Sequence, residues 1–266
     1  MEGAYAGPQA RFFGEMPAMS AAMLAFASAC VFIAALVRGF SGFGFALLSI
    51  SAVSMILPPA TVVPTMWILD FVAGVNLLPG IWRDIRWRSI AWLVGGSVVA
   101  TPFGVYLLAH APAAGMRIAL AAFILASAVA LLSGFQLRRE PGRVGRLGTG
   151  LAAGLLNGAF GIGGPPIIVF YLGSPIALAA GRASMIAAFL VMDLTGMPTI
   201  LAFGLVTPDV FKLIAVCIPT LVAGIFVGSR LVGRLDPDQV RRILLYLLMG
   251  MALVIGAQGI AGAGAL

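Results

Sequence analysis

The sequence predicts an all-α protein that crosses a membrane several times and is built from two repeats of inverted topology. Of its 266 residues, 61% are hydrophobic and only 9% are charged, and the mean hydropathy is +1.10. No soluble domain keeps such a composition in water. About 20 residues of helix cross the hydrocarbon of a bilayer, and apolar segments of this kind follow one another along most of the chain. We therefore expect one transmembrane domain over residues 1–266.

Eight apolar segments account for the expected helices. They cover residues 20–57, 61–80, 89–109, 117–136, 147–172, 183–204, 211–229 and 243–260. Six of them have about the length of one crossing. The first and the fifth contain clustered glycines, so each is expected to break into two helices joined by a hairpin or re-entrant turn. The sequence thus predicts up to ten helices.

The two broken segments share the same glycine spacing. The matched pairs, all at an offset of 119, are Gly39 with Gly158, Gly42 with Gly161, and Gly44 with Gly163. This repetition indicates a duplicated chain whose helices break at equivalent points. Matched breaks in apolar segments are the best sequence pointer to the binding site of a transporter.

Arginine-rich loops indicate how the segments are threaded. The arginines of three loops are Arg83, Arg86 and Arg88; Arg138, Arg139, Arg143 and Arg146; and Arg230, Arg234, Arg241 and Arg242. Loops of this kind are usually cytoplasmic, so an even number of crossings should separate each loop from the next. Three apolar segments lie between the second and third loops, and the count becomes even only if segment 147–172 enters and leaves on the same side. Each arm would then have about a dozen residues, about 18 Å of helix, which reaches the middle of the bilayer.

The same treatment of segment 20–57 gives two halves of opposite orientation. The first repeat covers residues 20–136, the second covers residues 147–260, and a basic cytoplasmic linker, 137–146, joins them. Each repeat is a broken helix followed by three transmembrane helices. With this assignment twelve of the 16 Lys and Arg residues are cytoplasmic.

The glycine turns are expected to form an anion site. Non-helical backbone at membrane depth is tolerated only around a cavity or inside protein. The second arm of each hairpin begins just after its glycines, so two helix amino termini with free N–H groups would point at the midplane. Close helix packing is the alternative role of the glycines. The predicted substrate-binding residues are Arg38, Gly39, Ser41, Gly42, Gly44, Asn157, Gly158, Gly161, Gly163 and Gly164.

Three charged residues lie inside the apolar segments. Arg38 lies eighteen residues beyond Ser20 and needs a partner, which is either a bound oxyanion or an acidic side chain. Asp70 and Asp193 are predicted coupling residues that take up and release protons; their alternative is a structural role, such as pairing with Arg38. Asp193 is the preferred proton carrier because no arginine lies in its motif.

The residue inventory argues against other classes of protein. His110 is the only histidine, and the two cysteines are far apart, so no catalytic residues, metal site or cofactor are expected. A haem-holding or scaffold subunit is disfavoured for the same reason. The net charge of +7 is explained by the orientation of the loops, so we expect no nucleic-acid partner. The expected partners are a small anion, the lipid bilayer and protons.

The two glycine motifs, of which residues 158–166 are the clearer copy, resemble those of the TauE/SafE family of sulfite and organosulfonate exporters. The likeness runs from about residue 20 to 260 and includes the basic loop between the halves and the stretch 234–237. It implies a secondary transporter of the prokaryotic inner membrane that exports sulfite, thiosulfate or a short organosulfonate, bound at mid-membrane between the hairpin tips. The alternative is a proton-coupled uptake transporter or channel for another small anion, such as a carboxylate.

One departure from the pattern concerns the first motif. Phe45 and Ala46 stand where the second motif has Gly164 and Pro165. The two hairpins are therefore expected to contribute unequally, with the more apolar part of the substrate near the first hairpin.

Overall fold

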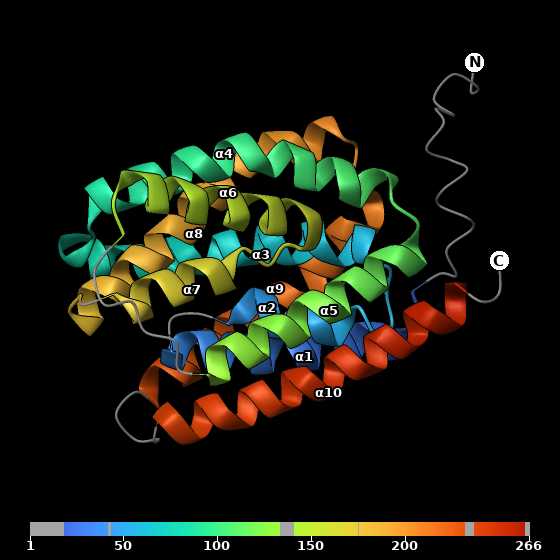
Figure 1. Ribbon diagram of the computed structural model, residues 1–266. Coiled ribbons are helices and arrows are strands. Elements are labelled where there is room, and N and C mark those ends of the chain that lie inside the picture. The colour runs from blue at the N-terminus through green and yellow to red at the C-terminus, as the bar shows by residue number, and fades with distance from the viewer. Residues whose placement is uncertain (1–18, 42–43, 134–140, 175, 232–236, 264–266) are drawn as a thin grey trace, which may run out of the picture.

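The computed structural model describes residues 19–41, 44–133, 141–174, 176–231 and 237–263, and within these residues every regular element is helical (Figure 1). The elements are α1 (Ala21–Ser41), α2 (Phe45–Val53), α3 (Pro59–Ile81), the short 3-10 helix η2 (Trp82–Asp84), α4 (Trp87–His110), α5 (Ala113–Leu132), α6 (Arg143–Phe160), α7 (Gly164–Gly173), α8 (Leu178–Ala202), α9 (Pro208–Arg230) and α10 (Pro237–Ala263). The predicted all-α class and the ten α-helices are confirmed.

Each predicted apolar segment contains the expected helix or pair of helices. The first segment divides into α1 and α2, and the fifth divides into α6 and α7. Within the described residues, five helices, α1, α3, α4, α8 and α9, are long and apolar enough to cross a membrane. The protein is therefore a multi-pass membrane protein, as predicted.

The predicted equality of the hairpin arms is wrong. α1 has 21 residues and α6 has 18, whereas α2 has 9 and α7 has 10. At 1.5 Å per residue α1 is about 31 Å long, enough to cross the hydrocarbon, while α2 is about 14 Å long. Each hairpin is thus one long arm and one half-length arm.

The long arms extend so far because each lies against another helix over most of its length. α1 packs on α9 and α6 packs on α4. Glycines bring these helices into backbone contact: a Cβ on Gly228 would collide with the carbonyl oxygen of Leu36, and one on Gly154 with that of Ser97. Small residues permit such close approach of transmembrane helices.

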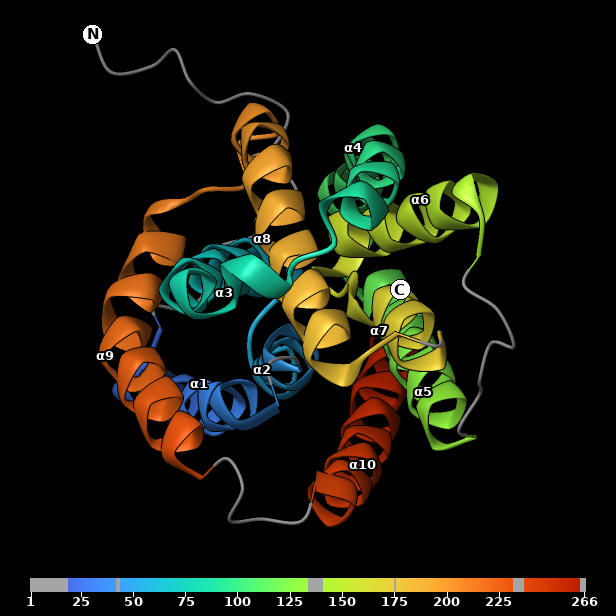
Figure 2. The same cartoon turned by 90° about the vertical axis from the view of Figure 1, so that its left-hand side faces the viewer.

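Helix packing repeats between the two halves. α1 packs on α9 as α6 packs on α4, and α3 packs on α9 as α8 packs on α4. The short arms follow the same rule, because α2 packs on α3 and α7 on α8. Two further contacts, α3 with α8 and α5 with α10, join equivalent helices, and Figure 2 shows α3 and α8 close together near the centre. This pattern supports the predicted duplication, whereas the boundaries 20–136 and 147–260 stay a prediction.

The basic loops that can be placed lie at one end of the molecule. Arg86 and Arg88 after η2 line the same surface depression as Arg146 of α6, and the guanidinium of Arg143 lies 5.7 Å from the ring centre of Trp92. The starts of α6 and α10 lie at the same end as the junction of α3 and α4, on the left in Figure 1. Residues 137–140 of the predicted linker 137–146 lie outside the described residues. The cytoplasmic location of the linker stays a prediction.

Candidate functional site

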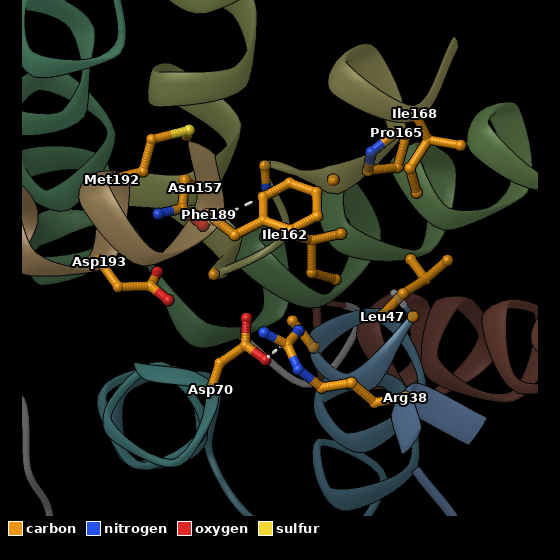
Figure 3. Close-up of a pocket in the computed structure, with 15 residues that line it drawn as sticks. Arg38, Leu47, Asp70, Asn157, Ile162, Pro165, Ile168, Phe189, Met192 and Asp193 are labelled. Carbon is orange, nitrogen blue, oxygen red and sulfur yellow. Dashed lines mark hydrogen bonds and ion pairs between the residues drawn. The ribbon is translucent and has the colours of Figure 1, made fainter. Parts of the chain in front are cut away.

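A small cavity lies between the two hairpins, where α3 and α8 pass each other (Figure 3). Its polar side chains are Arg38, Asp70, Asn157 and Asp193, which come from α1, α3, α6 and α8. Both glycine turns reach it, through Gly44 in the first hairpin and through residues 161–164 in the second. The structure therefore brings together residues that are more than 150 positions apart in the sequence.

Arg38 and Asp70 form a buried ion pair. The Nη1 atom of Arg38 lies 2.6 Å from the Oδ1 atom of Asp70, and the two residues are only 1% and 6% exposed. Of the two partners predicted for Arg38, a bound oxyanion or an acidic side chain, the structure shows an acidic side chain at Nη1. The Nε and Nη2 atoms of Arg38 are buried and have no hydrogen-bond partner among the described residues. Buried donors without a partner are costly, so these two nitrogens stay candidates for ligand contact.

Asp193 lies on the other side of the cavity. It is 4% exposed, and its Oδ2 atom has no hydrogen-bond partner in the part of the chain that is described. Its charged neighbours are Asp70 and Arg38, and the side chains of Asn157 and Trp67 lie close to it. The cavity therefore contains one guanidinium and two carboxyl groups, with Arg38 paired to the nearer carboxyl.

Asn157 holds the second turn in shape. Its backbone carbonyl accepts a hydrogen bond from the Gly161 N–H at 2.7 Å, and its Oδ1 atom accepts one from the Gly163 N–H at 3.2 Å. Its Nδ2 atom has no hydrogen-bond partner among the described residues. Asn157 thus ends α6, stabilises the turn and leaves one amide donor beside the cavity.

Two glycines at the turns have positive φ. Gly161 has φ +67, and an added Cβ there would lie 2.7 Å from Cδ1 of Ile50. Gly44 has φ +91 and precedes α2. Glycine adopts this left-handed conformation without the strain that a side chain brings. Both turns therefore depend on glycine, although Gly42, the counterpart of Gly161, lies outside the described residues.

Not every predicted site residue lines the cavity. Gly39 and Gly158 face neighbouring helices, since a Cβ on Gly39 would meet the backbone of Ile225 in α9 and one on Gly158 that of Thr101 in α4. These two glycines therefore serve helix packing in the structure, and their predicted role in substrate binding stays a prediction. Gly163 and Gly164 do line the cavity. Ser41 ends α1, and its side chain lies outside the described part.

Sequence reasoning did not identify the apolar side of the cavity. We call this the apolar wall: Ile162, Pro165, Ile168, Phe189 and Met192. It is formed by the second turn, α7 and α8. Apolar residues in an apolar segment give no signal of a binding site. The apolar wall can be recognised only in the structure, where α7 packs on α8 beside the cavity.

A buried cavity with ionisable side chains, placed between two broken helices of a multi-pass protein, is the arrangement of a membrane transporter. The chain belongs to the sulfite exporter TauE/SafE family, whose sequence pattern matches residues 27–255. It is 26% identical, over 222 residues, to the probable sulfite/organosulfonate exporter TauE of Cupriavidus necator, which covers 81% of this chain and 85% of the relative. No solved structure matches the chain.

These comparisons confirm the family predicted from the glycine motifs. They also agree with the expected location in a prokaryotic inner membrane, since the relative is bacterial. Among the described residues no group of His, Cys, Asp and Glu could hold a metal ion.

Proposed function

We propose that the protein exports a small sulfur-containing anion, such as sulfite, thiosulfate or a short organosulfonate, and binds it in the cavity between the hairpins. Membership of an exporter family supports the transport of sulfur anions. The observation that carries the proposed site is Arg38, which lines the cavity and whose buried Nε and Nη2 atoms have no hydrogen-bond partner among the described residues. An oxyanion accepts two parallel hydrogen bonds from a guanidinium, so its binding would satisfy both donors.

Export is favoured by the membrane potential. An inside-negative potential drives an anion outward by about 2.3 kcal/mol per charge per 100 mV. The cavity is small in this conformation: its volume of about 30 Å³ accommodates about two water molecules. A sulfite ion has four heavy atoms, so transport requires the hairpins or α3 and α8 to move apart.

Proteoliposomes loaded with radiolabelled sulfite test this function. An imposed inside-negative potential should accelerate efflux, and Arg38→Lys, which keeps the charge but loses the planar fork, should slow it strongly. Arg83→Lys, at an exposed position in η2, is the matched control and should behave like the unaltered protein. Retention of sulfite, thiosulfate and sulfonates alike by the unaltered protein would refute the proposal.

The alternative, proton-coupled uptake, is favoured by one observation. Asp193 is a buried carboxyl group in the same cavity, and its Oδ2 atom has no hydrogen-bond partner among the described residues. An ionised Asp193 would repel an incoming anion, whereas a protonated one would not, so the anion and a proton would bind together. The two modes differ in what drives the flux. Uptake should depend on a pH gradient that is acidic outside, and export should depend on the membrane potential.

An exporter family is also in keeping with the prediction that the chain is not an enzyme. The other predicted partners, protons and the lipid bilayer, belong to the proposed mechanism.

A further inference from the structure

The two short arms, α2 and α7, begin at matched positions of the sequence but present different numbers of N–H groups to the cavity. The four positions that open α2 are residues 44–47, and those that open α7 are residues 163–166, at the same offset of 119. The first four N–H groups of a helix have no partner within it. They are the groups that bind an anion at a helix amino terminus.

All four positions at the start of α2 carry an N–H group. The first hydrogen bond of this helix runs from the Leu48 N–H to the Gly44 carbonyl at 3.0 Å, and no side chain caps its amino terminus. Gly44, Ala46 and Leu47 line the cavity. Among the described residues the N–H groups of positions 44–47 have no hydrogen-bond partner, and they lie beside the site.

The start of α7 is depleted of donors. Pro165 and Pro166 have no N–H group, and the Gly163 N–H already donates to Oδ1 of Asn157 at 3.2 Å. Only Gly164 keeps a free N–H among the four positions. Asp193, on the neighbouring α8, adds a carboxyl group to this side of the cavity.

Arg38 supplies the second, independent observation on the side of α2. It is 1% exposed, it lines the cavity together with Gly44, Ala46 and Leu47, and its Nε and Nη2 atoms have no partner among the described residues. The Nε and Nη2 donors of Arg38 and the N–H groups of α2 thus converge on one half of the cavity, where the carboxylate of Asp70 is paired with the third guanidinium nitrogen. The apolar wall occupies the opposite half, as Figure 3 shows for Ile162, Ile168 and Phe189 relative to Arg38.

We infer that the cavity binds its anion in one orientation, with the oxyanion head on the amino terminus of α2 and Arg38, and a short apolar tail against the apolar wall. The ligand class is an alkyl sulfonate, for which inorganic sulfite would occupy only the head subsite. This orientation is opposite to the one expected from the sequence, which places the more apolar part of the substrate near the first hairpin. The difference arises because Pro165 and Pro166 remove donors from the second turn. The inference rests on the proposed function.

The head subsite is tested by copying the second motif into the first. Ala46→Pro places a proline where α7 has Pro165, in the first turn where helices tolerate it, and removes one N–H. We expect the purified protein to bind sulfite, methanesulfonate and propane-1-sulfonate about tenfold more weakly, and all three to a similar degree, because the lost hydrogen bond goes to a charged group. Ala46→Gly keeps the N–H at the same position and is the matched comparison, which should bind all three anions more tightly than Ala46→Pro does.

The tail subsite is tested with the same three anions. Ile168→Ala should weaken the binding of propane-1-sulfonate about fivefold more than the binding of sulfite, since it removes apolar contact area that only the tail uses. Val169→Ala is the control on the same helix, at a position that does not line the cavity. In the unaltered protein each buried methylene should tighten binding about fourfold.

The outcomes distinguish a failure of the inferred orientation from a failure of the proposed function. Equal binding by Ala46→Pro and Ala46→Gly, or equal losses of sulfite and propane-1-sulfonate in Ile168→Ala, would overturn the orientation alone. If Ala46→Pro does not fold, the Ile168→Ala comparison decides by itself. Failure of the unaltered protein to bind any of the three anions would instead overturn the proposed function and the orientation with it.

Discussion

Asp70 on α3 and Asp193 on α8 lie close to matched positions of the two predicted repeats, at an offset of 123, but of the two only Asp70 forms an ion pair with Arg38. The cavity therefore contains two carboxyl groups with different surroundings. The guanidinium compensates one of them, and the other has no basic partner of its own among the described residues. Their replacement should have different consequences.

Asp70→Asn should make the protein less stable without substrate and more responsive to it. The change leaves Arg38 as an uncompensated buried charge, which costs about 3–5 kcal/mol when one partner of a buried pair is removed. A bound anion would restore the balance. We expect a lower melting temperature in detergent and a larger rise on addition of sulfite than the unaltered protein shows. A rise no larger than that of the unaltered protein would contradict contact between Arg38 and the anion.

Asp193→Asn should separate proton coupling from binding. Asparagine keeps the size and hydrogen-bonding capacity of the side chain but cannot titrate. If Asp193 carries the proton, flux driven by a pH gradient should disappear while sulfite still binds. Flux that depends on the pH gradient as in the unaltered protein would assign Asp193 a structural role.

Gly161→Ala should abolish flux, since Gly161 has φ +67 and an added Cβ would lie 2.7 Å from Ile50. Gly148→Ala is a matched control within α6, the helix that Gly161 follows, because a Cβ at this exposed position meets nothing within 4 Å. Alanine is favoured over glycine inside a helix, so the control should transport normally and be at least as stable. Normal flux in Gly161→Ala, measured at equal amounts of folded protein, would show that the turn tolerates a side chain.

Gly158→Ala should act on assembly instead. Its added Cβ would collide with the backbone of Thr101 in α4, so we expect α6 to separate from α4 and the melting temperature to fall. Such a contact allows little relaxation, because the Cβ is attached directly to one backbone and meets the backbone of another helix. A protein of normal stability that has lost sulfite binding would return Gly158 to the binding site.

Threading through the membrane can be mapped with single cysteines in a background without Cys30 and Cys217. Replacements at Asp84 and Gly142 should react with an impermeant thiol reagent from the cytoplasm, and one at Ala113 from outside. All three positions are exposed. Reaction of positions 84 and 142 from opposite sides would contradict the inverted hairpins.

Sequence reasoning was sufficient for the broken helices, because left-handed turns inside an apolar segment require glycine and the spacing occurs twice. It did not predict the unequal arms, since arm length depends on the contacts of α1 with α9 and of α6 with α4, which join residues far apart in the chain. The charged residues of the cavity were recognisable because charges inside a membrane are rare.

The choice among partners for Arg38 could not be made from the sequence, where an anion and an acid satisfy a guanidinium equally well. The structure pairs one nitrogen of Arg38 with Asp70, and the other two have no hydrogen-bond partner among the described residues. Gly39 and Gly158 show the converse problem: glycine serves close packing as well as turns, and spacing alone does not distinguish these uses.

The contacts of the long arms mean that neither half of the chain is a separate building block. α1 lies against α9, and α6 against α4, so each arm is seated on a helix that the other half supplies. A chain divided between α5 and α6 would give two fragments in which the glycine-lined faces of the long arms lack the helices that they pack against. Co-expression of both fragments should be needed to recover a folded protein. During transport, α1 with α9 and α6 with α4 would travel as pairs, each drawn from both halves.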